Sequence, residues 1–180
     1  MQNGTVELAR GDSTLTGRLN DGQLHGPVTI EEFGRPQANL SYSHGQLNGP
    51  LTLYHANGKV CAHMPYTEDR VHGLAKFFAA EGGLQRTAHY RHGRLHGEAC
   101  NYFADGSMAE QEHYRDGVRE GAYRRFHSNG QVAFSAHYLR GVPVEPGRAF
   151  TEDGRALNAE GKPVSRLKGW WQAMFEQPQS

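Results

Sequence analysis

Eleven histidines in a chain of 180 residues raise the question of a metal site. His25, His72 and His96 each precede a loop glycine. Those that precede a tyrosine are His89, His113 and His137. If each set marks copies of one structural unit, neighbouring copies lie roughly 10 Å apart, two strand spacings in a sheet, too far to share a zinc ion whose nitrogen ligands lie at ~2.1 Å. We therefore expect no metal site, and the second set is a candidate contact ladder for a partner.

The sequence contains none of the common catalytic motifs, such as GxSxG, a P-loop, HExxH or a helix-opening GxGxxG. Glu110 and Glu112 lie two residues apart on one strand face, which is typical of a solvated surface and not of an acid/base pair. Cys61 and Cys100 do not form a CxxC motif, so we expect two buried thiols, with a single disulfide as the alternative. The sequence thus predicts a protein that is not an enzyme and has no cofactor.

Glycine is over-represented in the composition: it accounts for 23 of the 180 residues, about 13%, whereas its typical usage is near 7%. Because eight Tyr, eight Phe and two Trp supply apolar mass, this excess indicates many tight turns and not disorder. The 19 basic and 19 acidic residues balance, which argues against a nucleic-acid interface. The sequence starts with no signal-peptide pattern, and no apolar run reaches the ~18 residues of a membrane span. We expect a cytoplasmic protein, although removal of a leader would leave the same sequence.

A unit of 24 residues recurs about five times. We count positions from its tyrosine, position 0, which is Tyr42, Tyr66, Tyr90, Tyr114 and Tyr138. Position 12 is aromatic, as Tyr54, Phe78, Tyr102, Phe126 and Phe150. Position 16 is always glycine, as Gly58, Gly82, Gly106, Gly130 and Gly154. Glycine also fills position 7 in the first four units and position 3 in all but one, where Asp69 stands. Such self-similarity at a fixed period is the signature of a repeat protein.

The dipeptides that end at position 16 predict hairpins. Four of them are Asn57-Gly58, Asp105-Gly106, Asn129-Gly130 and Asp153-Gly154. Such pairs are typical of type I′ turns, in which both residues have positive φ. The segments between hairpins, such as residues 43–49, carry glycines four apart and predict a second reversal. With no helical segment between the strands, the predicted fold class is all-β: an elongated, single-layer antiparallel meander with two short strands per repeat.

The repeat divides the chain into three parts. Residues 1–18 are expected to supply one or more capping strands, and a repeat array covers 19–160, with units near 19–41, 42–65, 66–89, 90–113, 114–137 and 138–160. Residues 161–180 form a tail, in which Ser165 is a plausible N-cap of a short amphipathic helix. Its apolar face consists of Leu167, Trp170, Trp171, Met174 and Phe175. A cap over the last strand is the plainer interpretation, with docking to a partner or a membrane surface as alternatives.

Side-chain alternation along a strand predicts two different faces. The aromatic residue at position 12, the aliphatic residue at position 18 and the tyrosine have even positions and are expected to form one structural face. The odd positions vary between units and are expected to bind a partner. The predicted partner-binding residues are Phe77, Asn101, Phe103, Tyr123 and Arg125, with His89, His113 and His137 alongside. Tyr, Phe and Arg dominate interface energetics, which favours this face; the alternative is that the tail helix covers it.

The pattern Y-x-x-G-x-x-x-G, followed by an aromatic residue, N/D-G and a further tyrosine, resembles the MORN repeat in its 24-residue bacterial variant. Residues 90–97 and 114–121 carry the pattern most clearly, and the resemblance covers about residues 19–154. Asp69 and Glu145 depart from it, each in place of a loop glycine. The resemblance implies an elongated, curled β-sheet of one layer.

The resemblance also implies a function. Bacterial proteins that resemble this variant are often antitoxins or immunity proteins, which neutralise a toxin by binding it, whereas others are scaffolds and eukaryotic relatives have been linked to membranes. Our first hypothesis is an immunity or antitoxin-like protein whose variable face holds a bacterial toxin or secreted effector and blocks its active site. A protein-interaction scaffold without a toxin partner is the alternative, and phospholipid binding is less favoured.

Overall fold

The computed structural model describes residues 3–164, which form one antiparallel sheet of 18 strands. The strands are β1 (Gly4–Arg10), β2 (Ser13–Asn20), β3 (Gln23–Leu24), β4 (Gly26–Glu32), β5 (Arg35–Ser43), β6 (Gln46–Leu47), β7 (Gly49–Tyr54), β8 (Val60–Thr67), β9 (Arg70–Val71), β10 (Gly73–Phe78), β11 (Leu84–Arg91), β12 (Arg94–Tyr102), β13 (Met108–Arg115), β14 (Val118–Arg119), β15 (Gly121–Phe126), β16 (Val132–Leu139), β17 (Val142–Pro143) and β18 (Arg148–Ala149). The predicted all-β fold is confirmed. The predicted C-terminal helix falls in residues 165–180, outside the described residues.

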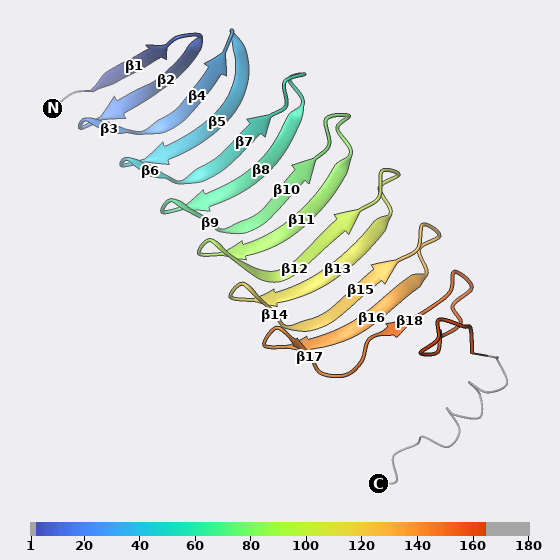
Figure 1. The fold of residues 1–180 in the computed structure, drawn as a ribbon. Coiled ribbons are helices and arrows are strands. Elements are labelled where there is room, and N and C mark those ends of the chain that lie inside the picture. The colour runs from blue at the N-terminus through green and yellow to red at the C-terminus, as the bar shows by residue number, and fades with distance from the viewer. Residues whose placement is uncertain (1–2, 165–180) are drawn as a thin grey trace.

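The long strands pair in chain order, so the sheet is a meander. The two-residue strands β3, β6, β9, β14 and β17 each pair with the long strand before them and complete a turn. Figure 1 shows a single curved layer, with the N-terminus at one end of the array and β18 at the other. The described part of the chain contains no helix long and apolar enough to cross a membrane.

Each repeat reverses direction at two edges of the sheet, through two kinds of turn. At the first, which we call the short-turn edge, two residues link the strands and both have positive φ, as in His92 (48°) and Gly93 (81°). These are the type I′ turns. The sequence-based assignment of type I′ turns to the four Asn-Gly and Asp-Gly dipeptides that end at position 16 is wrong, because only their glycines have positive φ.

Those dipeptides occupy the opposite, long-turn edge, where the loop is longer. Phe103 donates its backbone N–H to the carbonyl of Ser107 at 2.8 Å, and of the residues between them only Gly106 has positive φ, 85°. A type I turn followed by a glycine in the left-handed region fits such a loop. Asp105 is favoured there for its side chain, because its Oδ1 accepts the amide hydrogen of Ser107 at 2.9 Å.

The glycine at position 7 is required by a close approach between strands. A Cβ added to Gly121 would lie 3.3 Å from the Cβ of His113, and one added to Gly97 would lie 3.4 Å from the Cβ of His89. Both glycines also have positive φ, 113° and 99°. Space and backbone conformation therefore both explain why this position is glycine in four consecutive units.

A β-bulge in each long-turn hairpin from β4–β5 onwards decides which side chains share a face. In β10 and β11, Ala75 lies opposite Ala88 and Phe77 opposite Arg86, but the register then shifts, so that Phe78 lies opposite Leu84. Before the bulge, odd positions of the first strand therefore share a face with even positions of the second. We call this face A; it carries positions 7, 9, 11, 20, 22 and 0. Face B carries positions 8, 10, 12, 18, 21 and 23.

The predicted division of the repeat into an even structural face and an odd binding face is therefore wrong. The tyrosine of position 0 lies on face A, whereas the aromatic residue of position 12 and the aliphatic residue of position 18 lie on face B. The prediction carried the alternation of one strand through the loop into the next. The bulge adds a residue there, and one added residue changes the face of every side chain that follows.

The core is a row of mostly small apolar side chains along face A. The buried members of this row are Val28, Ala38, Leu51, Ala62, Ala75, Ala88 and Ala99. Because residues 3–164 form one layer, with no second sheet or helix over it, these side chains are covered by their larger neighbours on the same face. Cys100, which is 1% exposed, is the buried hydrophobic residue of face B.

The long-turn geometry predicts the cost of losing its glycine. Gly106→Val should lower the free energy of unfolding by roughly 1–3 kcal/mol, because a β-branched residue is strained at positive φ. No heavy atom lies within 4 Å of a Cβ added there, so the cost is one of backbone strain alone. Gly83→Val is the matched control, since Gly83 has equal space but no positive φ. Chemical denaturation measures both; equal stability of the two variants would contradict the turn assignment.

Candidate binding face

The structure divides the predicted partner-binding residues among three places. Face A receives Phe77, Asn101, Tyr123 and Arg125. Face B receives His89, His113 and His137. Phe103 follows the end of β12 and begins a loop of the long-turn edge. The first four residues are therefore together, but the histidines lie on the opposite side of the sheet from them.

Three hydrogen bonds join side chains of face A across four strands. Arg86 of β11 donates from Nη1 to Oδ1 of Asn101 in β12 at 2.9 Å. Asn101 in turn donates from Nδ2 to Oε2 of Glu110 in β13 at 2.6 Å. The other oxygen of Glu110 accepts the hydroxyl of Tyr123 from β15, also at 2.6 Å. Burial, with this hydrogen bond as the second cause, raises the pKa of Tyr123 to about 12. The chain of bonds fixes the side chains in one arrangement.

A second polar group on the same face centres on a buried carboxylate. Glu112 is only 4% exposed; its Oε2 accepts the hydroxyl of Tyr114 at 3.0 Å, and its Oε1 forms an ion pair with Arg119. Among residues 3–164 Oε1 has no other partner, so the Arg119 guanidinium compensates its burial. Contacts with Tyr114 and Glu112 raise the pKa of Arg119, and burial raises the pKa of Tyr114. The expectation that Glu112 is solvated is wrong.

Aromatic and cationic side chains complete the C-terminal part of face A. The ring of Tyr123 meets those of Phe134 and Tyr138 edge to face, with both pairs of centroids 5.9 Å apart. The Arg119 guanidinium lies 5.2 Å from the centre of the Tyr123 ring and 5.4 Å from that of Tyr138. Arg125 lies 5.1 Å over Phe134. Cation–π and edge-to-face pairs of this kind favour a fixed arrangement of large side chains.

Face A changes in character along the array. Position 11 is apolar in the early repeats, as Leu53 and Phe77, but polar in the later ones, as Asn101 and Arg125. The sequence pattern predicts this row but not the residues that lie beside it, which are Arg86, Glu110, Arg119 and Phe134. Their signal is cross-strand pairing: Arg86 lies opposite Asn101 and Phe134 opposite Arg125. Recognising it requires the register, which the bulge sets.

Two of the three predicted histidines on face B contact the backbone of the neighbouring strand. His89 donates from Nδ1 to the carbonyl of Glu98 at 3.2 Å, and His113 from Nδ1 to the carbonyl of Ala122 at 3.1 Å. A carbonyl oxygen can only accept, so Nδ1 of each ring carries a proton. These rings therefore have a role in the register of the sheet, besides any contact with a partner.

The chemistry available on face B is limited. Residues 3–164 contain no group of three or more His, Cys, Asp or Glu side chains placed to hold a metal ion. Cys61 and Cys100 are free thiols. Cys100 donates to Oε1 of Glu98 at 3.1 Å, which lowers the pKa of Glu98, and burial above all raises the pKa of the Cys100 thiol to about 11. A thiol that stays protonated at neutral pH is a poor nucleophile.

Comparison with known proteins identifies the repeat. Residues 47–68, 95–116 and 119–139 match the sequence profile of a family described as a MORN repeat variant. No curated protein sequence matches the chain.

Among solved structures, TarM overlaps the chain with a TM-score of 0.36 and 13% identity, over 60% of this chain and 19% of TarM. A mutant of S. aureus TarM, in complex with Fondaparinux, alpha-GlcNAc-glycerol and UDP, gives 0.35 and 11%, over 64% and 21%. Accessory secretory protein 1,2 and 3 of Streptococcus pneumoniae gives 0.25 and 12%, over 66% and 19%. This chain thus spans about a fifth of those proteins, and such low TM-scores say nothing about its activity.

The buried carboxylate predicts an asymmetry between two arginines. Arg119→Met should lower the free energy of unfolding by about 1–3 kcal/mol, because it leaves Glu112 buried without its charged partner. Arg115→Met is the matched control: its ion pair with Glu120 is 3.6 Å long, its side chain is 70% exposed, and such pairs contribute little. Denaturant titration of both variants tests this, and a loss from Arg115→Met as large as that from Arg119→Met would contradict it.

Proposed function

We propose that this chain, a MORN-repeat protein, binds a protein partner through face A and neutralises that partner, as an immunity or antitoxin-like protein does. MORN repeats are generally interaction modules, which agrees with a partner-binding function. The neutralising function goes further. It rests on the resemblance to the repeat variant of bacterial antitoxins, together with the properties of face A.

The observation that carries the proposal is the prearranged cluster of large side chains on face A. Tyr and Arg are enriched among the residues that dominate binding energy at interfaces. Here Tyr123 and Arg125 are already positioned by Glu110 and Phe134, so binding costs little side-chain entropy. These side chains also lie on one open sheet of a single layer.

The variation of position 11 adds specificity. A partner that lies along face A contacts Leu53 and Phe77 near the middle of the sheet. Towards β16 it contacts Asn101 and Arg125. Such a surface fits a partner that is apolar at one end of its footprint and polar at the other. The constant positions of the repeat hold the sheet, and these changing positions can be adapted to one partner.

The test requires a defined partner, and the product of the reading frame beside the gene of this chain is the one to use. Phe77→Ala and Arg125→Ala should each weaken binding by more than about 1 kcal/mol, measured by calorimetry, with melting temperatures within a few degrees of the parent. Cells that express the toxic partner should regain growth with the parent chain and lose that rescue with either variant.

The neighbouring residues on the opposite face supply matched controls. Lys76→Ala and Arg124→Ala change the adjacent, exposed side chains of face B and should leave binding and rescue unchanged. If these controls lose affinity while the face A variants keep it, the partner binds face B. If the neighbouring gene product is not bound at all, the neutralising function assigned here is wrong.

A further inference from the structure

A cluster of arginines lies at the short-turn edge, away from face A. Arg70, Arg91, His92 and Arg94, with Asp116, line a hollow of about 520 Å³, which we call the basic notch. Three successive repeats contribute, through the turns that follow β8, β11 and β13. The notch therefore exists only because the repeats stack.

The backbone under the notch is fixed. Gly93 donates its N–H to the carbonyl of Val71, and Gly117 to that of Leu95, both at 2.8 Å. The ring of His92 meets that of His72 edge to face, with centroids 5.0 Å apart. The walls of the notch are thus held by bonds between successive repeats, and only the ends of the arginine side chains are left to adjust.

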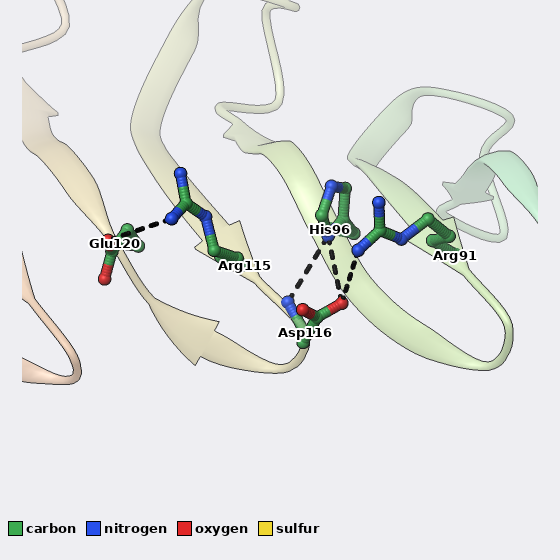
Figure 2. Close-up of polar contacts among 5 residues, drawn as sticks. All are labelled: Arg91, His96, Arg115, Asp116 and Glu120. Atoms are coloured by element: carbon green, nitrogen blue, oxygen red, sulfur yellow. Dashed lines mark hydrogen bonds and ion pairs between the residues drawn. The ribbon is translucent and has the colours of Figure 1, made fainter.

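The notch already holds one carboxylate, which belongs to the chain itself. Figure 2 shows Asp116 between Arg91 and His96: its Oδ1 accepts from Nη2 of Arg91 at 2.8 Å and lies 3.3 Å from Nδ1 of His96. The hydrogen bond from Arg91 lowers the pKa of Asp116, so the carboxylate stays charged. Among residues 3–164, Arg70 and Arg94 form no ion pair. The guanidinium groups of Arg70 and Arg94 therefore have no carboxylate partner within that range, because Asp116 pairs with Arg91.

We propose that the basic notch binds an acidic segment of a protein partner, whose carboxylates pair with Arg70 and Arg94. The inference rests on the proposed protein-binding function but uses a separate surface. Guanidinium groups pair strongly with carboxylates, and Arg91 already pairs with Asp116 inside the notch through one contact, from Nη2 to Oδ1 at 2.8 Å. The segment extends the contact with face A and makes association faster at low salt.

The surroundings of the notch favour a protein over a membrane or a nucleic acid. In the next turn Arg115 pairs with Glu120, whose carboxylate also accepts the N–H of Arg140 at 2.9 Å. A carboxylate thus accompanies Arg115 in that turn, as Asp116 accompanies Arg91 inside the notch. Lipid surfaces are bound by clusters of four to eight basic residues and nucleic acids by extended basic surfaces. The zero net charge of the chain points the same way.

A fluorescent oligoglutamate peptide is the probe, with fluorescence anisotropy at low salt as the measurement. Arg70→Gln combined with Arg94→Gln should weaken its binding by about tenfold or more. Arg10→Gln combined with Arg18→Gln removes the same charge at exposed positions of β1 and β2 and should change it little. Asp116→Asn should tighten binding, because it frees Arg91 while Asn tolerates the positive φ of 51°.

Several results would overturn the assignment. If the notch variant and the control variant lose the same affinity for the peptide, the binding depends on the overall charge of the chain and not on the notch. Absence of peptide binding to the parent would remove the site. If vesicles with anionic lipid bind the parent chain but not the notch variant, while the peptide binds neither protein, the ligand is a lipid headgroup. None of these bears on face A, because the Phe77 and Arg125 variants test that surface separately.

Discussion

The backbone amide of each short turn donates a hydrogen bond to a carbonyl of the preceding repeat, as Gly93 does to Val71 and Gly117 to Leu95. At the long-turn edge, side chains reach in the other direction: Nε2 of His55 lies 2.9 Å from the carbonyl of Phe78, and Asn57 donates to that of Ala80 at 2.7 Å. A sheet of one layer has no second layer to fix its curvature. These bonds at both edges take that place, and the geometry of face A and of the basic notch depends on them.

Much of the architecture could be predicted from the sequence, because the determinants of a meander are local and repeat. Tyrosines 24 residues apart and glycines at fixed positions identify the unit and its two reversals without knowledge of tertiary contacts. The turn types could not be predicted as safely. Both edges carry glycine, and the presence of positive φ at His92 as well as Gly93 depends on the number of residues in the loop.

The candidate site was harder to predict, since it depends on which strands face each other. Phe77, Asn101, Tyr123 and Arg125 were predicted to act together, and the register does bring them to one face. The prediction grouped His89, His113 and His137 with them because these histidines also have odd positions in the repeat. The bulge places the histidines on the other face. Glu112 shows a second limit: whether a carboxylate is solvated depends on Tyr114 and Arg119, and a strand pattern does not reveal such partners.

The hydrogen bonds at the two edges join only successive repeats, and this affects how such a chain can change in length during evolution. Each repeat touches only its neighbours, so duplication of a 24-residue segment inserts two strands and creates one new junction, while all other junctions keep their contacts. The array grows in steps of roughly 10 Å, two strand spacings. The length of the sheet can thus be matched to the size of a partner by whole units, independently of the substitutions that adjust individual side chains.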